Sequence, residues 1–130
     1  MAGVVVADAS LLIAHLDRSD LAHDRASALL LTHAGARLVA SPLTVAEVLV
    51  GPSRSGLVDQ AQTALRRLGI SITPLESDAP ARLASLRART GLRLPDCCVL
   101  LAAEQVLGEV ATFDNRLASG CRDLGIGVAG

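Results

Sequence analysis

Short apolar runs alternate with longer segments of helical periodicity along the chain, and this alternation limits the fold more than any other feature of the sequence. The pattern begins with the β-branched run Val4 to Ala7, which predicts a strand, and continues with apolar residues at helical spacing from Leu11 to Leu16. Short apolar strands that alternate with helices are typical of a parallel sheet covered on both faces. The sequence therefore predicts an α/β protein whose ligands collect at the carboxyl ends of the strands.

The same two periods predict the remaining elements. Further strands are expected at residues 37–40, 70–73, 110–113 and 126–128. Further helices are expected at residues 20–32, 42–50, 57–68, 78–90, 95–107 and 115–124. The segment Gly51 to Gly56 is rich in glycine, proline and serine and predicts a turn. We expect a single domain over residues 1–130, with a central parallel sheet of four to five short strands flanked by helices.

Composition excludes several kinds of chemistry. The chain has 130 residues, of which 51% are hydrophobic and 19% charged, as expected for a globular domain. All 12 basic residues are arginine, so a Schiff-base lysine and a phosphate-loop lysine are both excluded. The only aromatic residue is Phe113, which leaves no aromatic platform for stacking nucleobases. Contacts with nucleic acid must therefore be made mainly through phosphates.

The sequence also limits the compartment. Its longest apolar run, Cys97 to Ala103, is far shorter than the roughly 20 residues of a membrane-spanning helix. No positively charged stretch precedes Val4, as a signal peptide would require, so we expect a cytoplasmic protein with no membrane partner. The cysteines, Cys97, Cys98 and Cys121, have no metal-binding spacing and are interpreted as reduced core thiols.

Four carboxylates stand where ligands of such a sheet are bound. Asp8 follows the first strand, Glu47 lies in the helix after the second, Asp96 opens a helix after Pro95, and Asp114 follows the fourth strand. Each aspartate also has a structural interpretation, as a helix cap or as a charge that favours the helix dipole. Glu47 is the only charged residue in an apolar helix, so we expect it to be at least partly buried and to meet a cation or an arginine.

If these carboxylates converge, their repulsion needs an explanation. Two negative charges about 4 Å apart cost about 4 kcal/mol at an effective dielectric constant near 20. Such a cluster either shares protons or binds a divalent cation, and oxygen ligands favour Mg²⁺, or alternatively Mn²⁺, over Zn²⁺. Ser10, Thr112 and Asn115 are candidate donors that orient the carboxylates. A hydrated Mg²⁺ in such a site is suited to phosphodiester hydrolysis, which is nuclease chemistry.

These motifs resemble the PIN-domain ribonucleases, and in length and layout the VapC toxins of bacterial toxin–antitoxin pairs. Four segments in this order carry the resemblance: Val5 to Ser10, Ser41 to Val48, Leu94 to Asp96 with Val99 and Ala102-Ala103, and Ala111 to Asp114. The likeness extends over essentially the whole chain. Two departures are Cys97-Cys98, at positions that other residues usually hold, and Leu117, where many members carry an aromatic.

The resemblance implies a fold, an activity and partners. It implies a PIN-like α/β/α sandwich in which Asp8, Glu47, Asp96 and Asp114 form an acidic, metal-binding catalytic quartet. Ser10, Thr112 and Asn115 would support that quartet. It further implies Mg²⁺-dependent cleavage of single-stranded or looped RNA, a homodimer, and inhibition by a cognate VapB-like antitoxin.

Arginines next to Asp96 qualify the formal net charge of −1, which alone argues against tight nonspecific binding of nucleic acid. Four arginines and no acid lie between Ala79 and Pro95. We expect Arg89 and Arg93 to approach RNA phosphates, because a carboxylate-rich site needs positive charge beside it. The alternative is a solvated helix face.

The leading hypothesis is a Mg²⁺-dependent endoribonuclease, a hydrolase in which Asp8 and Asp96 hold the metal most directly. The first alternative is another metal-dependent phosphotransfer enzyme, such as a small phosphatase. The missing lysine and the missing D-x-D motif after the first strand argue against it. The second alternative is a catalytically silent interaction module whose acids are caps and ion pairs.

Overall fold

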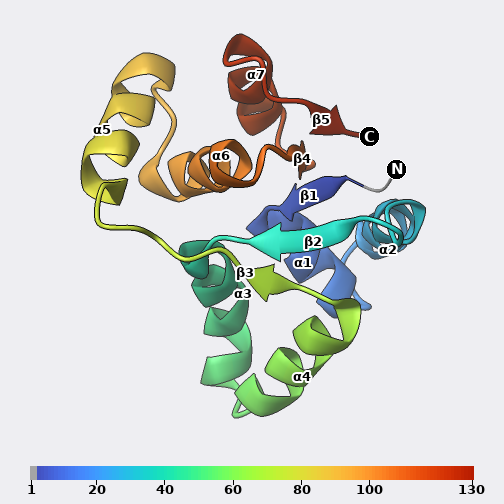
Figure 1. Ribbon diagram of the computed structural model, residues 1–130. Helices are drawn as coiled ribbons and strands as arrows, with labels where there is room; N and C mark the ends of the chain where they lie inside the picture. The colour runs from blue at the N-terminus through green and yellow to red at the C-terminus, as the bar shows by residue number, and fades with distance from the viewer. Residues whose placement is uncertain (1–2) are drawn as a thin grey trace.

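Five short strands form one parallel sheet in the computed structural model, which describes residues 3–130 (Figure 1). The strand order is β3-β2-β1-β4-β5, and every neighbouring pair is parallel. In chain order the elements are β1 (Val4–Ala7), α1 (Ala9–Leu16), α2 (His23–Thr32), β2 (Arg37–Ala40), α3 (Pro42–Arg54), α4 (Val58–Leu68), β3 (Ser71–Ile72), α5 (Ala79–Thr90), α6 (Leu94–Val106), β4 (Glu109–Ala111), α7 (Asn115–Asp123) and β5 (Val128–Ala129).

The first strand lies at the centre of the sheet. β1 pairs with β2 on one side, where Val6 lies opposite Val39, and with β4 on the other, where Val6 lies opposite Val110. The chain builds β2 and β3 outward from β1, then crosses to the other side of β1 for β4 and β5. This reversal of direction beside β1 is the position at which open α/β sheets bind their ligands.

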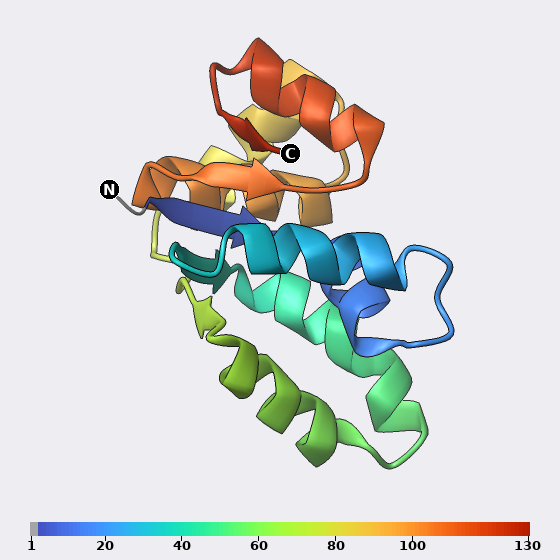
Figure 2. The same ribbon diagram turned by 90° about the vertical axis from the view of Figure 1, so that its right-hand side faces the viewer.

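Two layers of helices cover the two faces of the sheet, as Figures 1 and 2 show. Alternating side chains of β1 divide between them: Val5 and Ala7 pack with α1, α2, α3 and α4, and Val6 packs with α5, α6 and α7. This alternation is the period of two that a strand imposes on its side chains. The predicted α/β/α sandwich around a parallel sheet is confirmed.

Among the described residues, α6 is the most deeply buried helix. Every residue from Cys97 to Ala103 is buried, which explains why the sequence is apolar there without interruption. All three cysteines are free and buried, as predicted for core thiols. Among residues 3–130, none of the helices combines the length and apolarity needed to cross a bilayer.

The turn predicted at residues 51–56 is confirmed only at Ser55 and Gly56. Helix α3 continues through Gly51 and Pro52 to Arg54. Pro52 removes one backbone donor near the end of the helix, and the carbonyls of the last turn still accept hydrogen bonds, including one of 2.8 Å from Leu57 N to Pro52 O. Other bounds shift by one to three residues: the helix expected at residues 20–32 begins at His23, and the fourth strand ends at Ala111.

Candidate active site

Asp8 lies at the junction of β1 and α1 and is buried, with 5% of its surface exposed. Its carboxylate caps α1 by accepting a hydrogen bond of 3.0 Å from Leu11 N. Its two oxygens also accept from the Ser10 hydroxyl at 2.9 and 3.0 Å, and one of them accepts from the Thr112 hydroxyl. Ser10 and Thr112 therefore hold this carboxylate in one orientation, which is the role that sequence reasoning gave them.

Thr112 links Asp8 to Asp114. While its hydroxyl donates to Asp8, its oxygen accepts a hydrogen bond of 2.9 Å from Asp114 N. Asp114 in turn caps α7, accepting from Arg116 N at 2.8 Å and Leu117 N at 3.2 Å. The capping interpretation of Asp8 and Asp114 is thus correct, and it does not exclude a chemical role, because each carboxylate keeps unused acceptor capacity.

Asp96 and Glu47 come from two helices that pack on opposite faces of the sheet. Asp96 lies half-buried in the first turn of α6. Glu47 is exposed on α3, and only the face of that helix that carries Thr44, Val45 and Val48 is buried. Glu47 is thus more exposed than predicted, because α3 is amphipathic rather than enclosed, although its carboxyl is still partly desolvated.

The pKa of Asp8 reports on its surroundings. Burial raises the pKa of this carboxyl above its ordinary value of 3.8. The hydrogen bonds from Thr112, Leu11 N and Ser10 oppose that shift, and the negative charge of Asp114 adds to it. Asp8 is thus a desolvated carboxylate that hydrogen bonds orient and a second carboxylate repels.

Burial and neighbouring charges also shift the pKa of Asp96. Burial raises its pKa, the charges of Asp114 and Asp8 raise it further, and the guanidinium groups of Arg93 and Arg116 lower it. The Asp96 carboxyl therefore lies close enough to two other acids and two arginines to be influenced by all four.

Glu47 belongs to the same electrostatic cluster. Partial desolvation raises the pKa of its carboxyl above 4.5, and the negative charges of Asp96 and Asp8 also raise it, whereas Arg93 lowers it. The chain thus brings together four carboxylates from separate elements, each repelled by at least one other. We call this set the acid cluster: Asp8, Glu47, Asp96 and Asp114.

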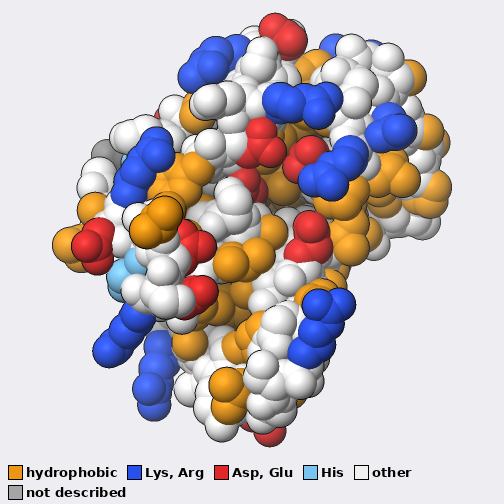
Figure 3. All heavy atoms as spheres, turned by 180° about the vertical axis from the view of Figure 1, so that it is seen from behind, with side chains coloured by type: hydrophobic (Ala, Val, Ile, Leu, Met, Phe, Trp, Pro, Cys, Tyr) orange, Lys and Arg blue, Asp and Glu red, His pale blue; other side chains and the backbone are white. Residues whose placement is uncertain are grey.

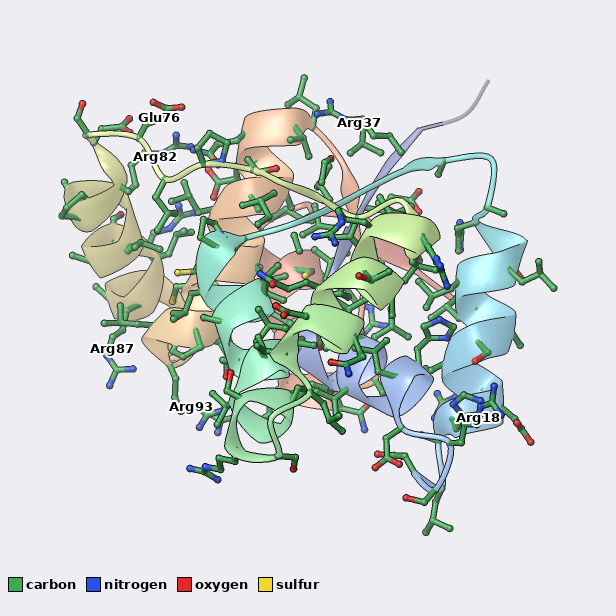
Figure 4. All side chains as sticks on the ribbon, turned by 90° about the horizontal axis from the view of Figure 1, so that it is seen from below. Arg18, Arg37, Glu76, Arg82, Arg87 and Arg93 are labelled. Atoms are coloured by element: carbon green, nitrogen blue, oxygen red, sulfur yellow. The ribbon has the colours of Figure 1, made fainter. Side chains whose placement is uncertain are left out.

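Arginine side chains surround the acid cluster. Figure 3 shows acidic side chains gathered in a hollow with arginines beside them, and Figure 4 shows Arg93 near α3, whereas Arg87 projects from α5. Within residues 3–130, neither Arg93 nor Arg116 makes an ion pair, so both guanidinium groups remain available. Arg89 is exposed on α5.

Sequence reasoning missed Arg116. This residue stands in the first turn of α7, directly after Asn115, and its side chain is exposed. A positive charge is unfavourable near a helix N-terminus, so an arginine there was a signal of some other role. Asn115 itself is exposed and makes no side-chain hydrogen bond to the acid cluster in the described part of the chain.

The acid cluster suits a hard cation by its chemistry. All of its donors are carboxylate oxygens, which Mg²⁺ and Mn²⁺ prefer, and their mutual repulsion is what a divalent cation relieves. Among residues 3–130, however, no three His, Cys, Asp or Glu side chains are placed so that they could hold a metal ion together. Mg²⁺ does not require three, because it keeps several waters and is usually bound by one or two carboxylates.

Comparisons with known proteins identify the family. The PIN domain family matches residues 5–122, a range that includes the whole acid cluster. The chain therefore belongs to the PIN domain family, whose members are generally nucleases that use divalent metal ions. The resemblance inferred from the sequence motifs is confirmed at this level.

A solved structure shows the same fold. The chain is similar to one described as a toxin–antitoxin complex from Klebsiella pneumoniae, with a TM-score of 0.76 and 24% sequence identity over 89% of this chain and 91% of that one. A comparison with curated proteins returned no match.

Proposed function

We propose that this protein is a Mg²⁺-dependent endoribonuclease of the VapC type, formed as one PIN-like domain over residues 1–130. The observation that carries the proposal is the acid cluster itself. Asp8, Glu47, Asp96 and Asp114 come from four separate elements, and three of them have pKa values raised by the charge of another member. A fold selected only for stability has no reason to gather like charges at one place.

In this proposal Asp8 and Asp96 hold the cation most directly. Asp8 is the better oriented of the two, because Ser10 and Thr112 fix its carboxylate. Glu47 and Asp114 complete the pocket, position the attacking water and accept its proton. When bound, Mg²⁺ supplies a water of lowered pKa and neutralises the charge that develops on the phosphate. Mn²⁺ has the same preference for oxygen ligands and is the alternative ion.

Positive side chains bring the substrate to an otherwise repulsive site. Arg93 and Arg116 flank the acid cluster, and Arg89 lies on the adjoining helix α5. We propose that they bind phosphates on either side of the scissile bond, which positions an RNA strand without reading its sequence. The near absence of aromatic residues agrees with contacts of this kind.

The proposed partners follow from the family and from the similar structure. Because that structure is a toxin–antitoxin complex, we propose a VapB-like antitoxin as the inhibitor of this chain. A homodimer and a cytoplasmic location complete the proposal.

The decisive experiment removes one negative charge at a time. We expect Asp8→Asn and Asp96→Asn to abolish Mg²⁺-dependent cleavage of single-stranded RNA with the fold retained. Asparagine at position 8 keeps the cap of α1, and Asp96 is not a helix cap. The control is Asp24→Asn, an exposed carboxylate in the first turn of α2, which should leave cleavage unchanged. Undiminished cleavage by either site variant would refute the assignment.

The same preparation separates the alternatives. Turnover of phosphomonoesters without cleavage of RNA would indicate a small phosphatase. No rise in melting temperature with Mg²⁺ or Mn²⁺, relative to chelator, would indicate a catalytically silent interaction module.

A further inference from the structure

A cavity of about 270 Å³ adjoins the acid cluster between α1 and α3. Its walls come from the C-terminal turn of α1 and the C-terminal half of α3, two helices that pack against each other. Ile13, Leu16, Val48 and Pro52 make the apolar part of the wall, and Ile13 is 40% exposed. The cavity is therefore open to solvent and has an apolar wall.

The polar side chains of this cavity are all acceptors. They are Asp17, which ends α1, and Glu47, which belongs to the acid cluster. One oxygen of Asp17 accepts hydrogen bonds from Ser19 N at 2.9 Å and from the Ser19 hydroxyl at 2.6 Å. These bonds lower the pKa of Asp17, so its carboxylate is fixed in place and charged at neutral pH. A ligand that donates N–H groups therefore suits these carboxylates better than one that presents only acceptors.

Glu47 connects this cavity to the chemistry. Its carboxylate lines the cavity and is also coupled to Asp96 and Asp8. A strand of RNA whose scissile phosphate lies at the acid cluster consequently places a neighbouring nucleotide at the mouth of the cavity.

We propose that the cavity between α1 and α3 binds one unpaired nucleobase beside the scissile phosphate, and that its carboxylates select guanine. This inference rests on the proposed ribonuclease function and adds a specificity determinant to it. The apolar walls contact the faces of the base, and Asp17 accepts from its Watson–Crick edge.

Guanine fits because of its donors. Its Watson–Crick edge carries N1–H and the exocyclic amino group side by side, and both can donate to Oδ2 of Asp17, the oxygen that Ser19 leaves free. Uracil offers one N–H flanked by two carbonyl oxygens, which a carboxylate repels. Single-stranded RNA presents these edges freely, since its bases are unstacked and can be turned outward. Asp17 is thus the residue that would read the base, whereas the arginines bind the backbone.

The first test measures base preference in catalysis. The substrates are oligouridylates that carry a single guanosine, adenosine, cytidine or inosine, and the readout is kcat/KM of the intact protein with Mg²⁺. We expect guanosine to be preferred over inosine, which lacks the 2-amino group, by about tenfold. Asp17→Asn should reduce that preference below about threefold, and Asp24→Asn should keep it. Cleavage of RNA with no base preference, or with a preference that Asp17→Asn leaves intact, overturns the inference while the ribonuclease stands.

The second test does not depend on activity. The sequence contains four isoleucines, and Ile13 is the one that lines the cavity, with Ile70, Ile72 and Ile126 as internal controls. We expect guanosine monophosphate to shift the methyl resonance of Ile13 selectively, more than inosine monophosphate does, and the shift to be lost in Asp17→Asn. A larger shift with arginine ethyl ester than with guanosine monophosphate would assign the cavity to a guanidinium group, and no shift with either would also overturn the proposal. These outcomes show whether the cavity binds guanine even if no RNA is cleaved.

Discussion

The start of α6 and the body of the same helix differ in charge and in burial. Arg93 is the N-cap residue of this helix, and Asp96, a member of the acid cluster, lies in its first turn. The body, from Cys97 to Ala103, is buried throughout and bears no charge. Burial of apolar surface stabilises the fold, whereas a carboxylate held near two others opposes it. The boundary between the charged start of the helix and its stabilising apolar body thus lies between Asp96 and Cys97.

The largest effect is expected in the body of the helix. Leu100 has no exposed surface, so Leu100→Ala should lower the free energy of unfolding by about 2–5 kcal/mol, through lost burial and the cavity that remains. The matched control is Leu107→Ala, just past the end of the helix, where the side chain is 92% exposed and the change should stay within about 0.5 kcal/mol. Urea denaturation measures both free energies of unfolding, and equal losses in the two variants would contradict the stabilising role of the buried helix body.

At the start of α6, the expected effect is on substrate binding. Arg93→Gln should lower kcat/KM for RNA by about tenfold, mainly through KM, and reduce the slope of log affinity against log salt by about 1. Its stability should not change measurably, because Arg93 is exposed and makes no ion pair within residues 3–130. Arg66→Gln, an exposed arginine of α4, serves as the control. A loss of kcat alone would argue against a role in binding phosphates.

Helix α7 allows a finer separation of cap and charge. Asp114→Ala removes both the cap of α7 and one carboxylate, and it should cost about 1 kcal/mol of folding free energy. Asp114→Asn keeps the capping oxygen and should cost only a few tenths, yet both variants should lose RNA cleavage. Thermal melts and a cleavage assay together measure the two effects. If Asn restored activity, the carboxylate would be a cap only.

The smallest effect concerns pH. Neighbouring charges and burial raise the pKa of Asp96, so the folded state binds this proton more tightly than the unfolded state does. Its favourable contribution is complete below the ordinary value of 3.8 and is lost as the pH rises through the raised value. In chelator, Asp96→Asn should therefore gain stability relative to the natural chain as the pH rises toward neutrality. A gap in melting temperature that stays constant with pH would show that Asp96 is not under this strain.

Much of the fold could be predicted from periodicity, because buried parallel strands appear in the sequence as short apolar runs and helices as longer amphipathic segments. Three carboxylates of the acid cluster could be singled out from the sequence because they follow strands or open helices, and Glu47 because it is the only charge in an apolar segment. The continuation of α3 through Pro52 could not be predicted, since a proline near a helix end costs little and tertiary packing decides whether the helix stops there. Nor could the exposure of Glu47, because an apolar sequence around it does not reveal which face of the helix the sheet covers.

The place of β1 at the centre of the sheet governs when the acid cluster can assemble during synthesis. Asp8 is among the first residues to leave the ribosome, but Thr112, which holds its carboxylate, follows 104 residues later. Until β4 is inserted beside β1, one side of the first strand has no partner, and Thr112 and Asp114 are both missing. A nascent chain, or one truncated before β4, therefore cannot assemble the complete acid cluster.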